Sequence, residues 1–284
     1  MLNGYQAVNC HAFVNIMTIK EAIKVRKSVR TFTNQMLGDE GVAALESYLS
    51  SLTGPFPGEP LARISVLRPG HGVDVSTFAT YGVISGAQLY IALIIDTREG
   101  VKADLAGGYM MEHAVLWATA HGWGTCWLGG TMRRARFAKA LNLQDYEKIV
   151  AVSPVGYAAN RKRFADRLFR RVAGSNQRKP FSELFFINDF THPYPETGIF
   201  ADAFKAVRLA PSATNKQPWR VLVQNADVYF YAAPDPGFQA NDIGIAMAHF
   251  DIERGIVAPW SAEGQAPASK WPCFVKASIL HNQD

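Results

Sequence analysis

The sequence predicts an α+β fold in which helices layer a mixed sheet, and three observations lead to this fold class. Segments of helical periodicity and short apolar strands alternate along the chain without a regular βαβ rhythm. The 284 residues are 48% hydrophobic and 19% charged, which is an ordinary globular composition with enough apolar residues for a sizeable core. The order of predicted elements also recurs in the second half of the chain, which indicates an internal duplication.

The first part of the fold is predicted to hold three helices, three longer strands and one short strand. The expected helices are one opened by the capping box T-I-K-E at 18–21 and running to about Lys27, one after Asp39, and a long apolar one capped by Asp104 and ending at His121. The expected strands are 63–67, 89–95 and 148–157. A tight turn, a short strand and a glycine loop are expected at 122–131. Residues 1–16 are interpreted as a loose extension ahead of the fold.

The second part repeats this pattern in shorter form. A helical stripe at 200–207 precedes strands at 220–223 and 227–233, a helix capped by Asp242, and a last strand at 273–279. Y-I-A-L-I-I-D begins at Tyr90 and V-Y-F-Y-A-A-P begins at Val228, and each is followed 14 residues later by one of the two predicted capping aspartates. We therefore predict a complete half at 17–190 and a truncated half at 191–284, packed together as one unit.

Composition limits the classes of function. No apolar run is long enough to span a membrane, and the first residues lack the basic cluster of a signal peptide. The three cysteines include no C-x-x-C pair, which favours a reducing, cytoplasmic location. The net charge of +5 is concentrated at 161–179, where a site for a phosphate or an acidic partner and a solvated basic face are about equally expected. Nucleic acid is not expected as a partner, because no recognised binding motif surrounds this segment.

Three short motifs carry candidate chemistry. R-K-S-V-R at 26–30 suits an anion, although cations at the end of a helix can also serve only the helix dipole. The loop R-L-A-P-S-A-T-N-K-Q-P-W-R at 208–220 is dense in hydroxyl and amide groups that could read the polar edge of a heterocycle, or could simply form a turn. In W-L-G-G-T at 127–131, the glycines would allow backbone N–H groups to approach a planar ligand, and a plain strand and turn is equally compatible.

Together these motifs resemble the nitroreductase family. R-K-S-V-R-T-F resembles its flavin-phosphate motif, the 208–220 loop its most diagnostic segment, and G-W-G-T-C-W-L-G-G its glycine turn. The resemblance implies a three-layer αβα fold, FMN as cofactor and NADH or NADPH as co-substrate. It assigns the phosphate and ribityl end of FMN to Arg26, Lys27, Ser28, Arg30, Arg178 and Lys179. It assigns the isoalloxazine to Pro211, Ser212, Ala213 and Asn215, with backbone N–H groups of Gly129 and Gly130 facing flavin N5.

The order of the motifs departs from the common family. The P-S-x-x-N loop normally follows the Arg motif closely, whereas here that place holds T-G-P-F-P-G, with Gly54 and Pro57 where Ser212 and Asn215 would align. The second half has the loop but lacks the Arg motif. The chain thus resembles a minor branch of nitroreductases in which a fused pseudo-dimer retains one site, and we expect a monomer that binds one FMN.

The resemblance implies an enzyme that passes hydride through flavin N5 to a small-molecule acceptor such as a nitroaromatic or a quinone. No side chain is assigned as a catalytic acid, base or nucleophile, because the flavin carries the chemistry. Three alternatives stay open at this point. They are related flavin chemistry on the same scaffold (dehalogenation, flavin fragmentation or azoline oxidation), a non-catalytic flavin-binding protein, and a basic nucleic-acid-binding protein.

Overall fold

A computed structural model describes residues 17–58, 60–68, 83–130, 132, 134–159, 177–225, 227–234, 237–262 and 264–279. The extension predicted at 1–16 and most of the basic segment, residues 161–176, lie outside the described residues, so the expectations for them stay predictions. Helices and strands are interspersed in the described part, and the strands form two separate sheets, which confirms the α+β class.

The first sheet has four antiparallel strands in the order β1-β2-β4-β3. Its strands are β1 (Ala62–Leu67), β2 (Leu89–Asp96), β3 (Gly124–Thr125) and β4 (Glu147–Gly156). The second sheet has six strands in the order β6-β5-β7-β8-β10-β9, and only its β5–β7 pair is parallel. Its strands are β5 (Phe185–Ile187), β6 (Asp189–Pro193), β7 (Trp219–Gln224), β8 (Asp227–Ala232), β9 (Trp260–Ser261) and β10 (Cys273–Ser278).

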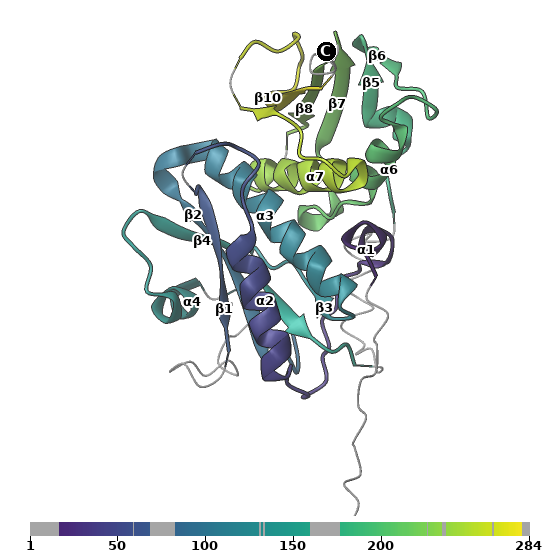
Figure 1. Cartoon of the computed structure of the whole chain (residues 1–284). Helices are drawn as coiled ribbons and strands as arrows, with labels where there is room; N and C mark the ends of the chain where they lie inside the picture. Colours follow the sequence, from purple (N-terminus) through teal and green to yellow (C-terminus); the bar gives the residue numbers. More distant parts are fainter. Residues whose placement is uncertain are drawn as a thin grey trace, which may run out of the picture.

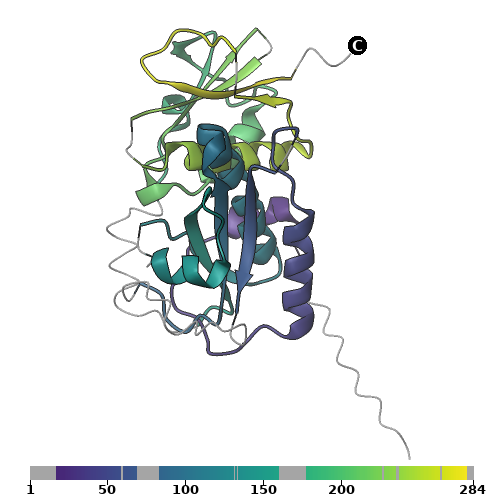
Figure 2. The same ribbon diagram turned by 90° about the vertical axis from the view of Figure 1, so that its left-hand side faces the viewer.

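Six α-helices accompany these sheets in the described ranges. They are α1 (Ile19–Val25), α2 (Asp39–Ser51), α3 (Gly100–Ala120), α4 (Arg134–Leu141), α6 (Ala201–Leu209) and α7 (Gln239–Arg254). α3 runs along the first sheet, and α7 lies between α3 and the second sheet (Figure 1). α4 covers the opposite face of the first sheet, so this half has the expected αβα layering (Figure 2). None of these helices combines the length and the apolar character that crossing a membrane requires.

The strand order of the first sheet recurs in the second. β1-β2-β4-β3 corresponds to β7-β8-β10-β9, every pair in both series is antiparallel, and a long helix follows the second strand of each series. This recurrence confirms the pseudo-duplication predicted from the sequence. The two halves also interlock. β5 and the start of β6 belong to the predicted first half, 17–190, and yet both strands extend the second sheet on the side of β7.

The truncation of the second half has a visible consequence for its outer face. α4 follows β3 in the first half, whereas 11 residues join β9 to β10 in the second and no described helix lies between them. Aromatic side chains cover that face instead. Phe190 packs edge-on against Tyr231 and Trp271, with ring centroids 5.0 Å apart in both pairs.

The central helices α3 and α7 cross at two glycines. A Cβ on Gly108 would collide with the carbonyl oxygen of Asn241, and a Cβ on Gly244 would collide with that of Leu105. The backbones therefore touch directly, and the two contacts are reciprocal, since each helix contributes one glycine and one carbonyl. This crossing is buried inside a single chain.

Both predicted aspartate caps are wrong. α3 begins at Gly100 and α7 at Gln239, so Asp104 and Asp242 lie inside their helices rather than ahead of them. Their carboxylates serve contacts between elements: Asp104 accepts a hydrogen bond of 2.7 Å from the Asn241 amide, and Asp242 accepts from the 208–220 loop. The capping box at Thr18 and Glu21 is confirmed.

Candidate functional site

The R-K-S-V-R motif begins where α1 ends. Arg26 is the C-cap of α1, and the following residues run beside β3, with the Val29 N–H donating to the Thr125 carbonyl at 2.8 Å. Arg26, Ser28 and Arg30 are half-buried and Lys27 is exposed. The motif is thereby fixed to the strand that leads directly into the glycine turn at 127–130.

The 208–220 loop is held in an unusual backbone conformation. Thr214, Asn215 and Gln217 have φ values of 49°, 58° and 50°, in the left-handed region that costs non-glycine residues free energy. Two contacts stabilise the loop, one within the loop itself and one from α7. Ser212 Oγ accepts from the Gln217 N–H at 2.8 Å, and the Asp242 carboxylate accepts from the Ala213 N–H at 3.0 Å.

Residues 177–179 are bound to this loop through several hydrogen bonds, four of which are shorter than 3.0 Å. The Arg178 guanidinium donates to Asn215 Oδ1 at 2.8 Å, and the Asn215 amide donates to the Gln177 carbonyl at 2.9 Å. The Lys179 N–H donates to Gln217 Oε1 at 2.9 Å, and its carbonyl accepts from Arg208 Nε at 2.7 Å. Arg178 and Lys179 are therefore brought to the P-S-x-x-N loop itself.

Three guanidinium groups converge at this point. The pKa of Arg178 is lowered, first by partial burial and then by repulsion from Arg26 and Arg208. Arg26 belongs to the first half of the chain and Arg208 to the second. Their joint effect on Arg178 indicates that both cations lie near its guanidinium group, so positive charge is concentrated where the Arg motif and the loop approach one another.

The glycine turn closes on the N-terminus of α7. A Cβ on Gly129 would lie 2.6 Å from Cζ of Phe238, the residue that precedes α7, so only glycine permits this contact. Gly130 is exposed, and a Cβ there would meet nothing within 4 Å. Asp242, one turn into α7, holds Ala213, so the same helix end contacts both the glycine turn and the loop.

These segments form a closed perimeter. Contacts lead from Ser28 to β3, through the glycine turn to Phe238, along α7 to Asp242 and the loop, and on to Arg178. The last step, from Arg178 to Arg26, is charge repulsion between two nearby guanidinium groups. The twelve predicted site residues all lie in segments that form this perimeter. Lys27 is the exposed cation among them.

Sequence reasoning missed several members of this perimeter. Arg208 and Gln217 stand inside the quoted loop motif, so the signal for them was present. Asp242 was noticed, but for a capping role. No local sequence signal identified Phe238, because its importance comes from the distant Gly129.

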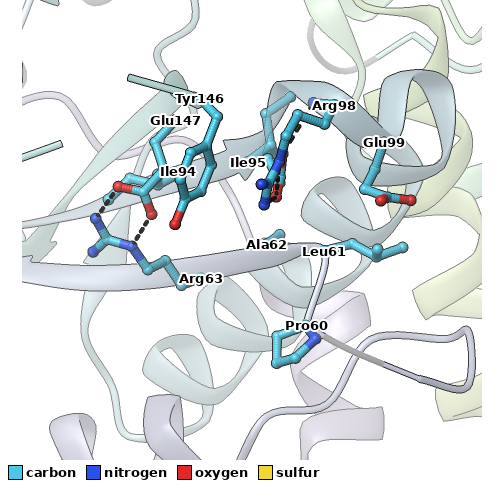
Figure 3. A pocket seen from close by; sticks show the side chains of 11 residues that line it. Pro60, Leu61, Ala62, Arg63, Ile94, Ile95, Arg98, Glu99, Tyr146 and Glu147 are labelled. Carbon is cyan, nitrogen blue, oxygen red and sulfur yellow. Dashed lines mark hydrogen bonds and ion pairs between the residues drawn. The ribbon is translucent and has the colours of Figure 1, made fainter. Parts of the chain in front are cut away.

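A pocket lies at the end of the first sheet that is remote from the glycine turn (Figure 3). Its charged groups neutralise one another: Arg63 Nε contacts Glu147 Oε1 at 2.6 Å, and Arg98 Nε contacts Asp96 Oδ1 at 2.9 Å. The Arg98 guanidinium also stacks on Tyr146, 3.9 Å from the ring centroid. Because both cations already face carboxylates, this pocket lacks the excess positive charge of the perimeter described above.

The T-G-P-F-P-G segment of the first half packs differently from the 208–220 loop, with which it aligns. Phe56 is buried in the main core, and the Lys102 ammonium lies 5.5 Å from the centroid of its ring. Gly54 packs near Ala106 and Met110 of α3. An apolar side chain thus fills the place where the other loop presents polar groups.

No cluster of three or more metal-ligating side chains occurs in the described part of the chain. The perimeter therefore offers cations, amides and backbone groups, which suit an anionic organic ligand with a polar edge. Thr125 adds to this set, because it is 1% exposed and its hydroxyl has no hydrogen-bond partner among the described residues.

Comparison with solved structures finds nitroreductase family proteins among those similar to this chain. A crystal structure described as a putative nitroreductase from Thermotoga maritima is similar over 96% of this chain and 99% of its own, with a TM-score of 0.62 and 19% identity. An FMN-dependent nitroreductase from Clostridium difficile matches 50% of this chain and 88% of its own, with a TM-score of 0.40 and 15% identity. A nitroreductase family protein from Clostridium novyi matches 52% and 90%, with a TM-score of 0.41 and 22% identity.

No curated protein matches the sequence. The family model described as "Putative TM nitroreductase" matches residues 18–254, which include both halves of the perimeter. The chain therefore belongs to this nitroreductase family.

Proposed function

We propose that the protein is an FMN-dependent NAD(P)H oxidoreductase with one flavin site, which lies inside the closed perimeter. The observation that carries the proposal is the convergence of Arg26, Arg178 and Arg208 from two halves of one chain. Positive charge concentrated in this way favours an anionic ligand, and guanidinium groups bind phosphate in a bidentate way. The family supports flavin as the bearer of that phosphate.

The described residues fit FMN at both of its ends. Arg26, Lys27, Ser28 and Arg30, with Arg178 and Lys179, would hold the phosphate and ribityl chain, and the unpartnered Thr125 hydroxyl lies beside Ser28 as a further hydrogen-bonding group. Asn215 would act partly through Arg178, because its amide oxygen accepts from that guanidinium. The loop residues Pro211, Ser212 and Ala213 are half-buried and would line the isoalloxazine.

The remaining wall is the glycine turn. The Phe238 ring lies against Gly129, whereas the space where a Cβ of Gly130 would stand is open. The backbone at Gly130 could therefore approach a planar ring directly, and the Gly129 N–H would face the ring from beside Phe238. When bound, FMN would supply hydride transfer through N5 between a reduced nicotinamide and a small acceptor such as a nitroaromatic or a quinone. The cations at the loop would favour the negative charge of the reduced state.

An absorbance spectrum of the purified protein tests this proposal. We expect flavin absorption that is bleached by NADPH or NADH under anaerobic conditions and that returns when a quinone is added. A yellow protein inert to both nucleotides would identify a flavin-binding protein without this activity. A protein that neither carries nor takes up FMN would contradict the proposal as a whole.

A further inference from the structure

A buried chain of hydrogen bonds links the two halves of the candidate site through the protein interior. Glu112 on α3 and His249 on α7 are both fully buried, and Glu112 Oε1 lies 3.0 Å from His249 Nε2. The other carboxylate oxygen of Glu112 accepts from the Trp127 indole at 2.8 Å. His249 Nδ1 lies 2.9 Å from the carbonyl oxygen of Ala206.

The ends of this chain lie next to the two walls of the site. Trp127 precedes Gly129 and Gly130 by two and three residues in the glycine turn of the first half. Ala206 precedes Arg208, where the 208–220 loop of the second half begins. The path Trp127–Glu112–His249–Ala206 thus connects the two walls across the α3–α7 interface.

The hydrogen-bonding roles in this path follow from its ends. The Ala206 carbonyl can only accept, so His249 Nδ1 carries a hydrogen, and the Trp127 indole can only donate. One further proton therefore lies between His249 Nε2 and Glu112 Oε1, whichever of the two groups holds it. The pair is neutral as a unit, and each of its four polar atoms has a partner.

Stabilisation of the core does not by itself account for such a pair. Burying two ionisable groups has a large desolvation cost, and well-packed apolar residues often stabilise a core as much or more. The pair instead fixes the relative position of the groups that it joins, because each hydrogen bond tolerates only a narrow range of distance and angle.

We propose that Glu112 and His249 are positioning residues that fix the glycine turn relative to the 208–220 loop, and so set the separation of the two walls that would enclose the flavin. This inference rests on the proposed function for its ligand. The coupling between the walls is itself a property of the protein without ligand and can be measured separately.

The chain offers a matched control in a second buried carboxylate at the same interface. Asp251 of α7 accepts from Tyr109 of α3 at 3.1 Å, from the Trp260 indole at 2.8 Å and from the Ala258 N–H at 3.1 Å. It joins α3 to α7 as Glu112 does, but its partners lie outside the glycine turn and the 208–220 loop. Its loss should loosen the interface without moving either wall.

The experiment compares FMN binding by wild type, Glu112→Leu, Trp127→Phe, Glu112→Gln and Asp251→Asn, using fluorescence titration of the apo-protein. Trp127→Phe removes only the indole donor and tests the proposal if Glu112→Leu does not fold. We expect Trp127→Phe to weaken FMN binding about tenfold, since the substitution leaves a buried oxygen of Glu112 without its donor. Glu112→Gln can still accept from Trp127 and donate to a neutral His249, so it should bind FMN nearly as wild type does, as should Asp251→Asn.

Amide hydrogen exchange of the same apo-proteins separates this inference from the proposed function. We expect Trp127→Phe to accelerate exchange in both 127–130 and 206–212, and Asp251→Asn to leave these segments unchanged. Equal FMN affinity in Trp127→Phe and wild type would overturn the positioning role, as would an equal loss in Asp251→Asn. If wild type does not bind FMN, the proposed function fails, but the exchange measurement still tests the coupling. Exchange in Trp127→Phe that changes at only one of the two walls would overturn the coupling.

Discussion

At the scale of single residues, the site depends on side chains that hold one another in place. Asn215 accepts a hydrogen bond from Arg178 and so orients it, and Gln217 accepts one from the Lys179 N–H. Asp242 accepts one from the Ala213 N–H. The sequence motif identified the loop because its amides and hydroxyls are too dense for an ordinary turn. It could not reveal which amide pairs with which partner, since residues 177–179 are distant in the chain and reach the loop only through the fold.

Arg26→Ala and Asn215→Ala should each weaken FMN binding, although they lie in different halves of the chain. Arg26 would contact the phosphate directly, and Asn215 holds Arg178 at 2.8 Å. Loss of a hydrogen bond that involves a charged group costs on the order of 1.5–3 kcal/mol, which is about a tenfold to hundredfold rise in Kd. Isothermal titration of the apo-protein with FMN measures this effect.

Pro57→Ala is the control for these two substitutions. Pro57 is exposed and stands in the T-G-P-F-P-G segment, where Asn215 would align in the other loop. We expect its FMN affinity to match that of wild type. A loss similar to that of Asn215→Ala would mean that the T-G-P-F-P-G segment also contributes to a flavin site.

At the scale of elements, periodicity predicted the longer strands and most of the helices, but it missed α4 and the short strands β5, β6 and β9. It was also less reliable about where helices begin. α3 starts four residues before Asp104, after a short 3-10 turn at 97–99, and α7 starts three residues before Asp242. Both aspartates have the composition of a cap, but their carboxylates bind partners on other elements. Local patterns cannot distinguish these uses, because the competing partner is supplied by tertiary packing.

The α3–α7 interface should make stability depend on pH through Asp251. Burial raises the pKa of this carboxyl from 3.8 to about 7, although the donors Trp260, Ala258 and Tyr109 and the nearby Arg254 oppose the shift. The folded state therefore binds a proton that the unfolded state releases between these two pKa values. Its contribution to stability is present below about pH 4 and is lost as the pH rises to about 7.

Asp251→Asn removes this dependence and serves to measure it. The free energy of unfolding of wild type should decline relative to that of the variant between pH 4 and pH 7, by on the order of 3 kcal/mol. His113 acts in the opposite direction, because burial and repulsion from His249 lower its pKa from 6.5 to about 4. Both proteins contain His113, so the difference between their urea-unfolding curves isolates Asp251, and parallel curves across this pH range would contradict the prediction.

At the scale of the whole molecule, the recurring strand order gives one chain the architecture of a pair. The reciprocal glycine crossing of α3 and α7 lies inside the chain, and the Arg motif of one half faces the loop of the other. The sequence predicted this pairing because the two copies retain the same order of elements. It could not predict that β5 and β6 would join the second sheet, since short strands at a sheet edge carry little pattern of their own.

The same architecture explains why a second flavin site is not expected. In the T-G-P-F-P-G segment, Phe56 is buried in the core. The aligned positions of the 208–220 loop carry polar groups instead. Filling that place with an apolar ring stabilises the core and removes the hydrogen-bonding groups that a second cofactor would need. We therefore propose a monomer with one site assembled from both of its halves.

Native mass spectrometry of the FMN-loaded protein tests this central claim most directly, because it reports the number of chains and the number of cofactors in one measurement. The account predicts a single chain of 31.3 kDa carrying one FMN, with no species that carries two. A dimer that holds two FMN molecules and loses them when its subunits separate would show that the site is shared between chains and would contradict the intramolecular site.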